Sequence, residues 1–217
     1  MEKYPDYETY RALYARYHQR GVEDLLGRLK PLENMSVMDL CAGDGRLTLK
    51  MLESGARSVL IVDAEAEMVP SILYQHRQVR VTINEIHHAL IEVITSGEFF
   101  DRIVCQQAVN YWLDQDTARS VAATLNHGGI FVFNTFTNKP SETPRVLQYE
   151  FEEHMFVEVS WLADGFVHHV QIRDGMEPHQ TSFRWLSTER FRELLFPYFE
   201  INEERREKTS LYWCQKK

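Results

Sequence analysis

The sequence has few cysteines, and none of them is paired at metal-ligand spacing. Its 217 residues include only Cys41, Cys105 and Cys214, which lie far apart in apolar runs. A structural zinc site draws on clustered Cys and His ligands, and a disulfide-stapled fold needs an even set of cysteines. We therefore expect neither, and we expect these thiols to pack as small buried side chains.

Long apolar segments and an excess of positive charge are also missing. No apolar run approaches the roughly 20 residues that span a bilayer, and the start, MEKYPDYETYR, lacks the apolar core of a secretion signal. The formal net charge is -8, whereas nucleic-acid binding relies on clustered Lys and Arg. These absences favour a cytoplasmic protein with no membrane or nucleic-acid partner.

Up to residue 136, short apolar runs alternate with helical patterns. Such alternation predicts βαβ units, whose parallel sheet is buried on both faces. We expect strands at residues 36–40, 58–64, 79–84, 99–109 and 129–136, and helices at residues 6–29, 45–55, 65–77 and 114–129, the last one ended by its glycines. These elements fit one domain of ordinary size.

The pattern changes after Phe136, where a loop with prolines leads into β-rich segments. Asp-Gly pairs at 164–165 and 174–175 separate these segments, and such pairs favour tight hairpin turns. We therefore expect an antiparallel β insert over residues 150–187. A helix and two further strands over residues 188–217 would then complete an α/β fold, a doubly wound and mostly parallel sheet of seven strands.

The stretch VMDLCAGDGRL, from Val37 to Leu47, joins a buried strand to a permissive turn. A tight connection between strand and helix is one explanation of the glycines. Alternatively, Gly43 and Gly45 let a cofactor lie against the backbone, beside the free N–H groups of the next helix. Asp63 ends the following strand about 20 residues later, where a carboxylate can accept hydrogen bonds from ribose hydroxyls. Asp63 therefore favours the cofactor.

With these residues the chain resembles the class I S-adenosylmethionine-dependent methyltransferases. The family pattern of an acidic residue followed by spaced glycines matches Asp39, Gly43 and Gly45, with Cys41 in place of the first glycine. That substitution also argues against a nicotinamide dinucleotide, which relies on a fuller glycine fingerprint. VDAEAEMV, FFDRIVCQQAVNYW and LNHGGIFVFNTF resemble later motifs of the family. The resemblance implies a Rossmann-like fold, S-adenosylmethionine as cofactor and S-adenosylhomocysteine as its product.

The resemblance also implies a set of cofactor contacts. The turn backbone would border the methionine portion, Asp39 would hold its ammonium through the turn or a water, and Asp63 would bind the ribose. Met68 would lie near the adenine, and Asn84 or Glu85 would contact the adenine amine. The implied contacts are Tyr14, Asp39, Cys41, Ala42, Gly43, Gly45, Asp63, Ala64, Met68, Asn84, Glu85, Ile86 and Gln106.

Tyr7, Tyr10, Tyr14 and Tyr17 recur at helical spacing near the N-terminus. Such a stripe commonly packs against a core. In the resembled family an N-terminal helix often covers the cofactor, where tyrosine rings could form a wall that excludes water. We expect residues 1–30 to form such a helical lid, with Tyr14 in contact with the cofactor.

The segment QQAVNYW places polar and aromatic side chains where a buried strand ends. The resemblance puts Gln106 beside the sulfonium. Buried amides need hydrogen-bonding partners, so packing alone explains Gln107 and Asn110 poorly. We expect this segment to line the acceptor pocket, with Gln107 and Tyr111 as candidate catalytic residues and Trp112 beside them.

Adjacent histidines occur in two places. In FVHHVQIR, strand alternation places His168 on the apolar face with Phe166 and His169 on the opposite face. A histidine on an apolar face is commonly a core residue, but if the insert covers the pocket, His168 is the candidate general base. His87 and His88 point apart on a helix or turn, so we expect no metal site there.

These features predict transfer of a methyl group from S-adenosylmethionine to the N or O atom of a small-molecule acceptor, with a homodimer as one option. A protein or RNA methyltransferase, and a non-catalytic S-adenosylmethionine-binding regulator, remain alternatives. The chain is interpreted as a single methyltransferase domain, whose parts are the lid at 1–30, the cofactor-binding core at 31–136, the insert at 150–187 and the final helix and strands at 188–217.

Overall fold

The computed structural model describes residues 21–136, 138–151, 154–173, 178–206 and 209–217. The chain divides into two compact units, each with its own sheet. Among the described residues, the larger unit contains 21–136 and 188–217, and the smaller contains the described part of 138–187. In the described part of the chain, no helix is both long and apolar enough to span a membrane.

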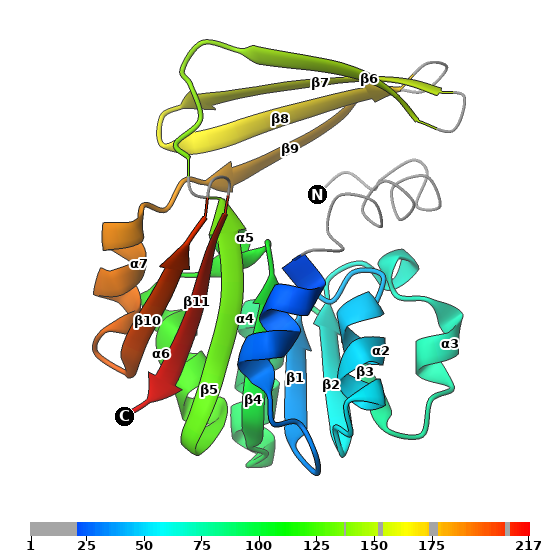
Figure 1. The fold of residues 1–217 in the computed structure, drawn as a ribbon, viewed down its shortest axis with the longest axis vertical. Coiled ribbons are helices and arrows are strands. Elements are labelled where there is room, and N and C mark those ends of the chain that lie inside the picture. The colour runs from blue at the N-terminus through cyan, green and yellow to red at the C-terminus, as the bar shows by residue number, and fades with distance from the viewer. Residues whose placement is uncertain (1–20, 137, 152–153, 174–177, 207–208) are drawn as a thin grey trace. The chain divides into compact units, whose positions relative to one another are not determined.

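The larger unit is built on a seven-stranded sheet with the order β10-β11-β5-β4-β1-β2-β3 (Figure 1). Its strands are β1 (Ser36–Leu40), β2 (Ser58–Asp63), β3 (Val79–Ile83), β4 (Phe100–Gln106), β5 (Leu125–Phe136), β10 (Phe199–Arg205) and β11 (Thr209–Lys216). Strands β1 to β5 are parallel, whereas β11 is antiparallel to both β5 and β10. The predicted doubly wound, mostly parallel sheet is confirmed. Chain order reverses between β1 and β4, and ligands of such sheets bind at that switch point.

Helices cover both faces of this sheet. They are α2 (Arg46–Glu53), α3 (Ser71–Tyr74), α4 (Ile86–Ser96), α5 (Val109–Trp112), α6 (Gln115–Thr124) and α7 (Thr188–Leu195), with a 3-10 turn η1 (Ala66–Met68). Figure 1 shows the helical residues 21–29 and α2 on one face and α4 and α6 on the other. Leu25 and Met51 are fully buried in the core on the first face, where they pack with Val37 and Val104 of the sheet.

Two of the predicted helices are shorter than expected. The single helix predicted over 65–77 is interrupted at Pro70, so the chain forms η1 and then α3. The helix predicted to end at its glycines ends instead at Thr124, and the glycine segment becomes the start of β5. There the Asn126 amide donates to Asp101 Oδ1 at 2.8 Å, which holds the segment beside β4. Sequence patterns do not report this contact, because its partners are 25 residues apart along the chain.

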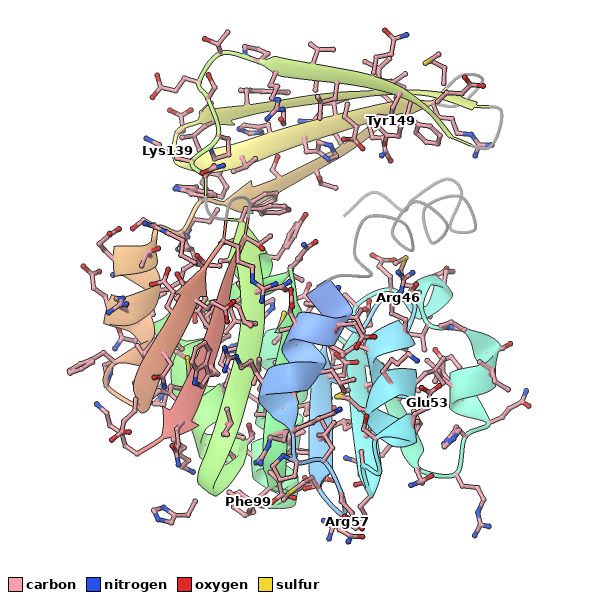
Figure 2. The ribbon with its side chains drawn as sticks, in the orientation of Figure 1. Arg46, Glu53, Arg57, Phe99, Lys139 and Tyr149 are labelled. Carbon is pink, nitrogen blue, oxygen red and sulfur yellow. The ribbon has the colours of Figure 1, made fainter. Side chains whose placement is uncertain are left out.

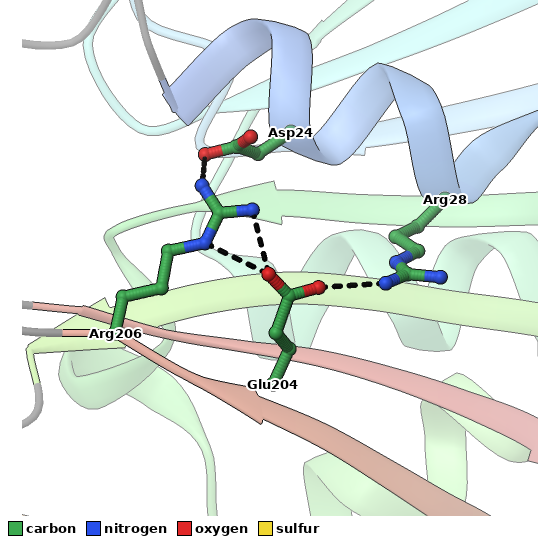
Figure 3. A network of polar contacts seen from close by, with 4 residues as sticks. All are labelled: Asp24, Arg28, Glu204 and Arg206. Atoms are coloured by element: carbon green, nitrogen blue, oxygen red, sulfur yellow. Dashed lines mark hydrogen bonds and ion pairs between the residues drawn. The ribbon is translucent and has the colours of Figure 1, made fainter.

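Residues 21–29 are tied to the hairpin β10–β11 by a charged network (Figure 3). Arg28 donates to Glu204 at 2.6 Å, and Arg206 bridges Glu204 and Asp24. The Arg28 guanidinium also lies 4.1 Å from the ring centroid of Trp213, a cation–π contact. The N-terminal helix is therefore fastened to the strands that complete the sheet.

The smaller unit is a four-stranded antiparallel sheet with the order β6-β7-β8-β9. Its strands are β6 (Arg145–Phe151), β7 (His154–Ala163), β8 (Phe166–Arg173) and β9 (His179–Arg184). Asp164 and Gly165 have φ values of 52° and 80°, the left-handed pair that a tight hairpin needs. The sheet includes β6, a strand that the sequence pattern did not predict, so it begins earlier than the expected insert.

Candidate functional site

The turn after β1 holds the chain in the left-handed conformation at Cys41, Gly43 and Gly45. Their φ values are 55°, 56° and 68°, a region that residues with a Cβ adopt at a cost. The Cys41 N–H donates to the Val62 carbonyl at 2.7 Å, and the Gly45 N–H donates to the Ala42 carbonyl at 3.0 Å. The chain therefore folds tightly across the carboxyl ends of β1 and β2 before α2 begins.

The two glycines of this turn have different surroundings. A Cβ built on Gly45 would lie 2.0 Å from Cδ1 of Leu73, so a side chain there would displace the Leu73 side chain. At Gly43 the nearest atom would be Cε of Met68 at 3.6 Å, an ordinary contact distance. Packing thus explains why position 45 is a glycine. At position 43 the glycine is explained by its backbone conformation and by the hydrogen bond that its N–H makes.

The acceptor of that hydrogen bond is the side chain of Asp63, the last residue of β2. Asp63 Oδ2 accepts a hydrogen bond from the Gly43 N–H at 2.8 Å, and Oδ1 accepts one from the Glu65 N–H at 3.0 Å. Burial raises the pKa of Asp63, and the N–H groups of Glu65 and Gly43 oppose the rise. Each carboxylate oxygen can accept a further bond, so Asp63 could bind ribose hydroxyls while it holds the turn.

Asp39 lies just before the turn and is 1% exposed. Burial raises its pKa to about 7, its hydrogen bond from Thr48 opposes the rise, and the charges of Asp63 and Asp44 add to it. The Thr48 hydroxyl donates to Asp39 Oδ2 at 2.6 Å. Arg46, labelled in Figure 2, is already bound by Asp44. A buried acid in such surroundings suits a cationic ligand such as the ammonium of S-adenosylmethionine.

Cys41 stands at the position of the family's first glycine. The Cys41 residue is half-buried, whereas Cys105 and Cys214 are buried as expected. Its thiol hydrogen-bonds that of Cys105, and this contact, with burial of the sulfur, raises the pKa of Cys41 well above its usual range. Such a thiol is a poor nucleophile, so Cys41 shapes the turn and does not react.

The remaining small and apolar residues of the expected cofactor set follow β1, β2 and β3. Met68 and Ile86 are buried, Ala42 is half-buried and Ala64 is exposed. Met68 approaches the turn at Gly43, as described above. The contacts of these residues with a cofactor remain predictions.

Asn84 and Glu85 follow β3 at the same edge of the sheet. Both ends of the Asn84 amide are engaged, since Nδ2 donates to Glu92 at 3.1 Å and Oδ1 accepts from the Glu85 N–H at 2.9 Å. The Glu85 side chain is exposed, 4.0 Å from His88. Glu85 therefore has the freer side chain, although the contact with the adenine is a prediction for either residue. Among the described residues, no cluster of three potential metal ligands occurs.

Gln106 and Gln107 lie where β4 ends. Gln106 pairs with Asn134 of β5, and the Gln107 N–H donates to Asn134 Oδ1 at 2.8 Å. Gln107 has a φ of 56°, a strained value that persists where the surrounding structure enforces it. β1 and β4 are neighbouring strands. A strained residue follows each of them at the switch point, Cys41 after β1 and Gln107 after β4.

The short helix α5 continues this segment. Asn110 is 3% exposed, and its Nδ2 donates to Thr135 Oγ1 at 2.7 Å. Tyr111 is 51% exposed. Gln107 Oε1, Asn110 Oδ1 and Trp112 Nε1 are buried and have no hydrogen-bond partner among the described residues. The segment predicted to line the acceptor pocket thus lies directly after β4. Catalytic roles for Gln107 and Tyr111 remain predictions.

Gly21 is the first described residue of the N-terminal helix. A Cβ built there would lie 3.0 Å from Asn134 Nδ2 and 3.3 Å from Gln106 Nε2. This end of the helix therefore lies against the carboxyl ends of β4 and β5. Tyr14 and the tyrosine stripe lie outside the described residues, so the proposed lid is untested.

His168 and His169 lie on opposite faces of β8 in the smaller unit, as strand alternation predicts. His168 Nδ1 is 2.9 Å from Ser182 Oγ, and its ring stacks on Trp161 with centroids 5.2 Å apart. Phe166, on the face of His168, is 41% exposed, whereas Val167 on the other face is 4% exposed. The more buried face is thus the one that carries His169, which differs from the expectation for His168.

Sequence reasoning missed a polar cluster on that buried face. Glu158 Oε1 accepts hydrogen bonds from Tyr149 at 2.5 Å and from Gln171 at 2.9 Å, and Glu158 Oε2 lies 3.9 Å from His169 Nε2. Burial would raise the pKa of Glu158, but the neighbouring His169 and the hydrogen bond from Tyr149 hold it below the usual value. The sequence signal that could have identified this cluster is a polar residue, Glu158, within an otherwise apolar strand. Asn134 is a polar residue of the same kind within β5.

Residues 37–129 match a family model described as a methyltransferase domain. No curated protein sequence matches the chain.

Several solved structures share the fold. An S-adenosylmethionine-dependent methyltransferase from Clostridium acetobutylicum is 17% identical with a TM-score of 0.73, over 96% of this chain and 98% of that one. CalS10, an amino pentose methyltransferase from Micromonospora echinaspora, is 13% identical with a TM-score of 0.75, over 100% of both chains. The sugar N-methyltransferase KedS8 from Streptoalloteichus is 14% identical with a TM-score of 0.71, over 100% of this chain and 97% of that one.

Residues 37–129 are thus similar to a methyltransferase domain, and the fold is shared with solved S-adenosylmethionine-dependent methyltransferases. S-adenosylmethionine is the cofactor that these similarities favour. The residues present fit that cofactor, because Gly43 presents bare backbone beside Asp63 and the buried Asp39 is complementary to a cation.

Proposed function

We propose that this enzyme methylates the amino nitrogen of a small polar acceptor, with amino sugars as the best-supported class. The observation that carries the proposal is similarity over the whole chain to CalS10, an amino pentose methyltransferase, and to KedS8, a sugar N-methyltransferase. The matched length includes the antiparallel sheet between β5 and β10, so the similarity extends beyond the cofactor-binding core. The acidic net charge of -8 also favours a small acceptor over RNA.

Bound S-adenosylmethionine supplies an electrophilic methyl group, so the chain has to hold and align the reactants. In this proposal Asp63 binds the ribose and fixes the turn through Gly43, while Asp39 favours the cationic end of the cofactor. Gln106 and Gln107 lie at the end of β4, at the switch point where the acceptor would approach. That residues 1–30 and 150–187 cover the reactants and exclude water remains a prediction.

A general base is useful when the acceptor arrives as an ammonium, because the attacking nitrogen needs a free lone pair. His168 is our candidate for this role. It is held by Ser182 and Trp161 in a fixed orientation, and a neutral imidazole can take a proton near neutral pH. If the acceptor arrives as a free amine, alignment alone suffices.

The proposal is tested with S-adenosylmethionine labelled in its methyl group. Purified enzyme is incubated with amino sugars, with the same sugars lacking nitrogen, with phenols, and with protein and RNA pools. We expect label in amino sugars at the nitrogen. Label in protein or RNA would select the corresponding alternative, and tight cofactor binding without transfer to any pool would favour a regulatory protein. A cytoplasmic location and a homodimer remain predictions.

A further inference from the structure

The left-handed residues that follow β1 and β4 are held in different ways. Cys41 has a φ of 55° and Gln107 a φ of 56°. The Cys41 N–H donates to a backbone carbonyl, that of Val62 on β2, at 2.7 Å. The Gln107 N–H donates instead to a side-chain oxygen, Asn134 Oδ1 on β5, at 2.8 Å. The turn after β4 therefore depends on the identity of one distant residue, whereas the turn after β1 is closed by the backbone.

These two hydrogen bonds hold the chain on opposite sides of the switch point. β1 and β4 are neighbours, β2 lies on the far side of β1, and β5 lies on the far side of β4. The chain that leaves β1 is thus bound toward β2, and the chain that leaves β4 is bound toward β5. The two bonds separate the segments at the place where ligands of such sheets bind.

The Asn134 amide is itself enclosed by its neighbours. Asn134 is 4% exposed, and it pairs with Gln106 across β4 and β5. A Cβ built on Gly21 would lie 3.0 Å from Asn134 Nδ2 and 3.3 Å from Gln106 Nε2, so a side chain at position 21 would press on both amides. Glycine weakens a helix, and this close approach explains its presence. The Asn134 amide therefore lies between the N-terminal helix and the turn at Gln107.

The turn at Gln107 needs the hydrogen bond from its N–H to Asn134. A residue with a Cβ adopts the left-handed conformation at a cost, and such strain persists where the surrounding structure enforces it. Gln107 is half-buried, so without Asn134 Oδ1 its N–H would lose a partner that water replaces poorly. Both effects favour relaxation of Gln107 to an ordinary conformation, which would redirect the chain that follows β4.

We propose that Asn134 is a positioning residue for methyl transfer, an inference that rests on the proposed function. Asn134 acts through Gln107, whose fixed turn sets the path of the chain beside the methyl group of the bound cofactor. Transfer depends on the alignment of the reacting atoms, and a displacement of about 1 Å can lower the rate about a hundredfold. Loss of the Asn134 oxygen therefore slows transfer, whereas cofactor affinity, which depends on Asp63 and the turn after β1, is preserved.

The hydrogen bond is tested first in the full-length enzyme alone. Asn134→Leu keeps a branched side chain without the accepting oxygen, whereas Asn134→Asp keeps an oxygen. We expect hydrogen exchange at the Gln107 N–H, followed by NMR, to be about tenfold faster in Asn134→Leu and close to the wild-type rate in Asn134→Asp. Exchange at the Cys41 N–H should be the same in all three proteins. A wild-type exchange rate at Gln107 in Asn134→Leu would overturn the proposal.

The consequence for the reaction is tested with S-adenosylmethionine whose methyl group is labelled for NMR. In Asn134→Leu we expect the signal of the bound methyl group to shift while the affinity, measured by calorimetry, is unchanged. Turnover with a methylated amino sugar should fall about tenfold to a hundredfold, and Asn134→Asp should recover most of it. An unshifted methyl signal, or turnover within about threefold of wild type, contradicts a positioning role. If the signal shifts and no amino sugar is methylated, the positioning role stands and the proposed function fails.

Two glycines of the N-terminal helix separate positioning from stability. Gly21→Ala and Gly27→Ala both favour the helix, but a Cβ at Gly27 would have nothing within 4 Å, whereas one at Gly21 presses on the Asn134 amide. We expect Gly21→Ala to speed exchange at the Gln107 N–H and to lower turnover about threefold to tenfold. Gly27→Ala should match the wild type. If Asn134→Leu does not fold, this pair decides, and equal exchange at Gln107 in the two variants would overturn the proposal.

Discussion

The carboxylate of Asp63 accepts a hydrogen bond from the backbone N–H of Gly43, at 2.8 Å. The bond joins the end of β2 to the glycine turn after β1, so one side chain both positions the turn and borders the expected ribose site. Substitution of Asp63 therefore has two effects on cofactor binding, loss of a ligand group and loosening of the turn.

Asp63→Ala is expected to weaken S-adenosylmethionine binding by about 1.5–3 kcal/mol, the range for charge-assisted hydrogen bonds. Isothermal titration calorimetry measures this loss. Asp116→Ala, at an exposed position of α6, is the matched control and should bind normally. Unchanged affinity in Asp63→Ala would remove Asp63 from the site.

Gly45→Ala is expected to destabilise the protein more than Gly97→Ala. Both glycines have positive φ, 68° and 70°, but a Cβ at Gly45 meets Leu73 at 2.0 Å whereas nothing lies within 4 Å of one at Gly97. The backbone conformation costs about 1–2 kcal/mol in either variant, and overpacking against Leu73 adds about 1–3 kcal/mol. Urea unfolding of both variants checks the difference, and equal losses would contradict the packing argument.

Asp39 is expected to make the cofactor-free protein less stable as pH rises. Its pKa is raised from 3.8 to about 7 by burial. The protonated form is favoured in the folded state, so its stabilising contribution is complete below pH 3.8 and is lost as pH rises through about 7. Asp39→Asn cannot ionise, so its free energy of unfolding should exceed that of wild type by about 2–3 kcal/mol more at pH 8 than at pH 5.

Urea unfolding at a series of pH values tests this prediction. Parallel pH dependences in Asp39→Asn and wild type would show that Asp39 does not titrate as inferred. Saturating S-adenosylmethionine should flatten the wild-type dependence if a cationic group binds near Asp39, because that group favours the carboxylate.

His168→Ala is expected to lower turnover by roughly 10²–10⁴-fold with cofactor affinity intact, the range for loss of a general base. His127→Ala, at an exposed position of β5, is the control. Turnover of His168→Ala within threefold of the wild-type value would mean that His168 only packs against Trp161 and Ser182. A His169→Ala variant, measured in parallel, shows whether the cluster around Glu158 is needed instead.

Much of the larger unit can be predicted from the sequence because its signals are local. Apolar runs such as residues 36–40 and 58–63 identify buried strands, and the spacing from Gly43 to Asp63 identifies the cofactor edge. The helix over 65–77 was predicted too long because the pattern does not show whether Pro70 begins one helix or separates two. β6 was missed because its residues, RVLQYEF, alternate weakly and follow a loop.

The parts of the site that could not be predicted depend on contacts between distant segments. Asn134 holds the Gln107 backbone across two neighbouring strands, and Thr135 holds Asn110. Neither bond has a sequence pattern, because the partners are joined only by strand pairing. The burial of the His169 face in the smaller unit is likewise not set by its composition, since that face carries the polar residues Glu158 and Gln171.

The position of β11 has a consequence for how the chain folds during synthesis. This strand lies between β5 and β10, so it is the neighbour of both. While a ribosome makes the chain, β5 has no partner on that side until residues 209–216 have emerged, and β10 cannot join the sheet at all. The backbone N–H and C=O groups along this edge of β5 therefore stay unpaired throughout the synthesis of the smaller sheet, and chaperone binding to the nascent chain should be strongest in that interval.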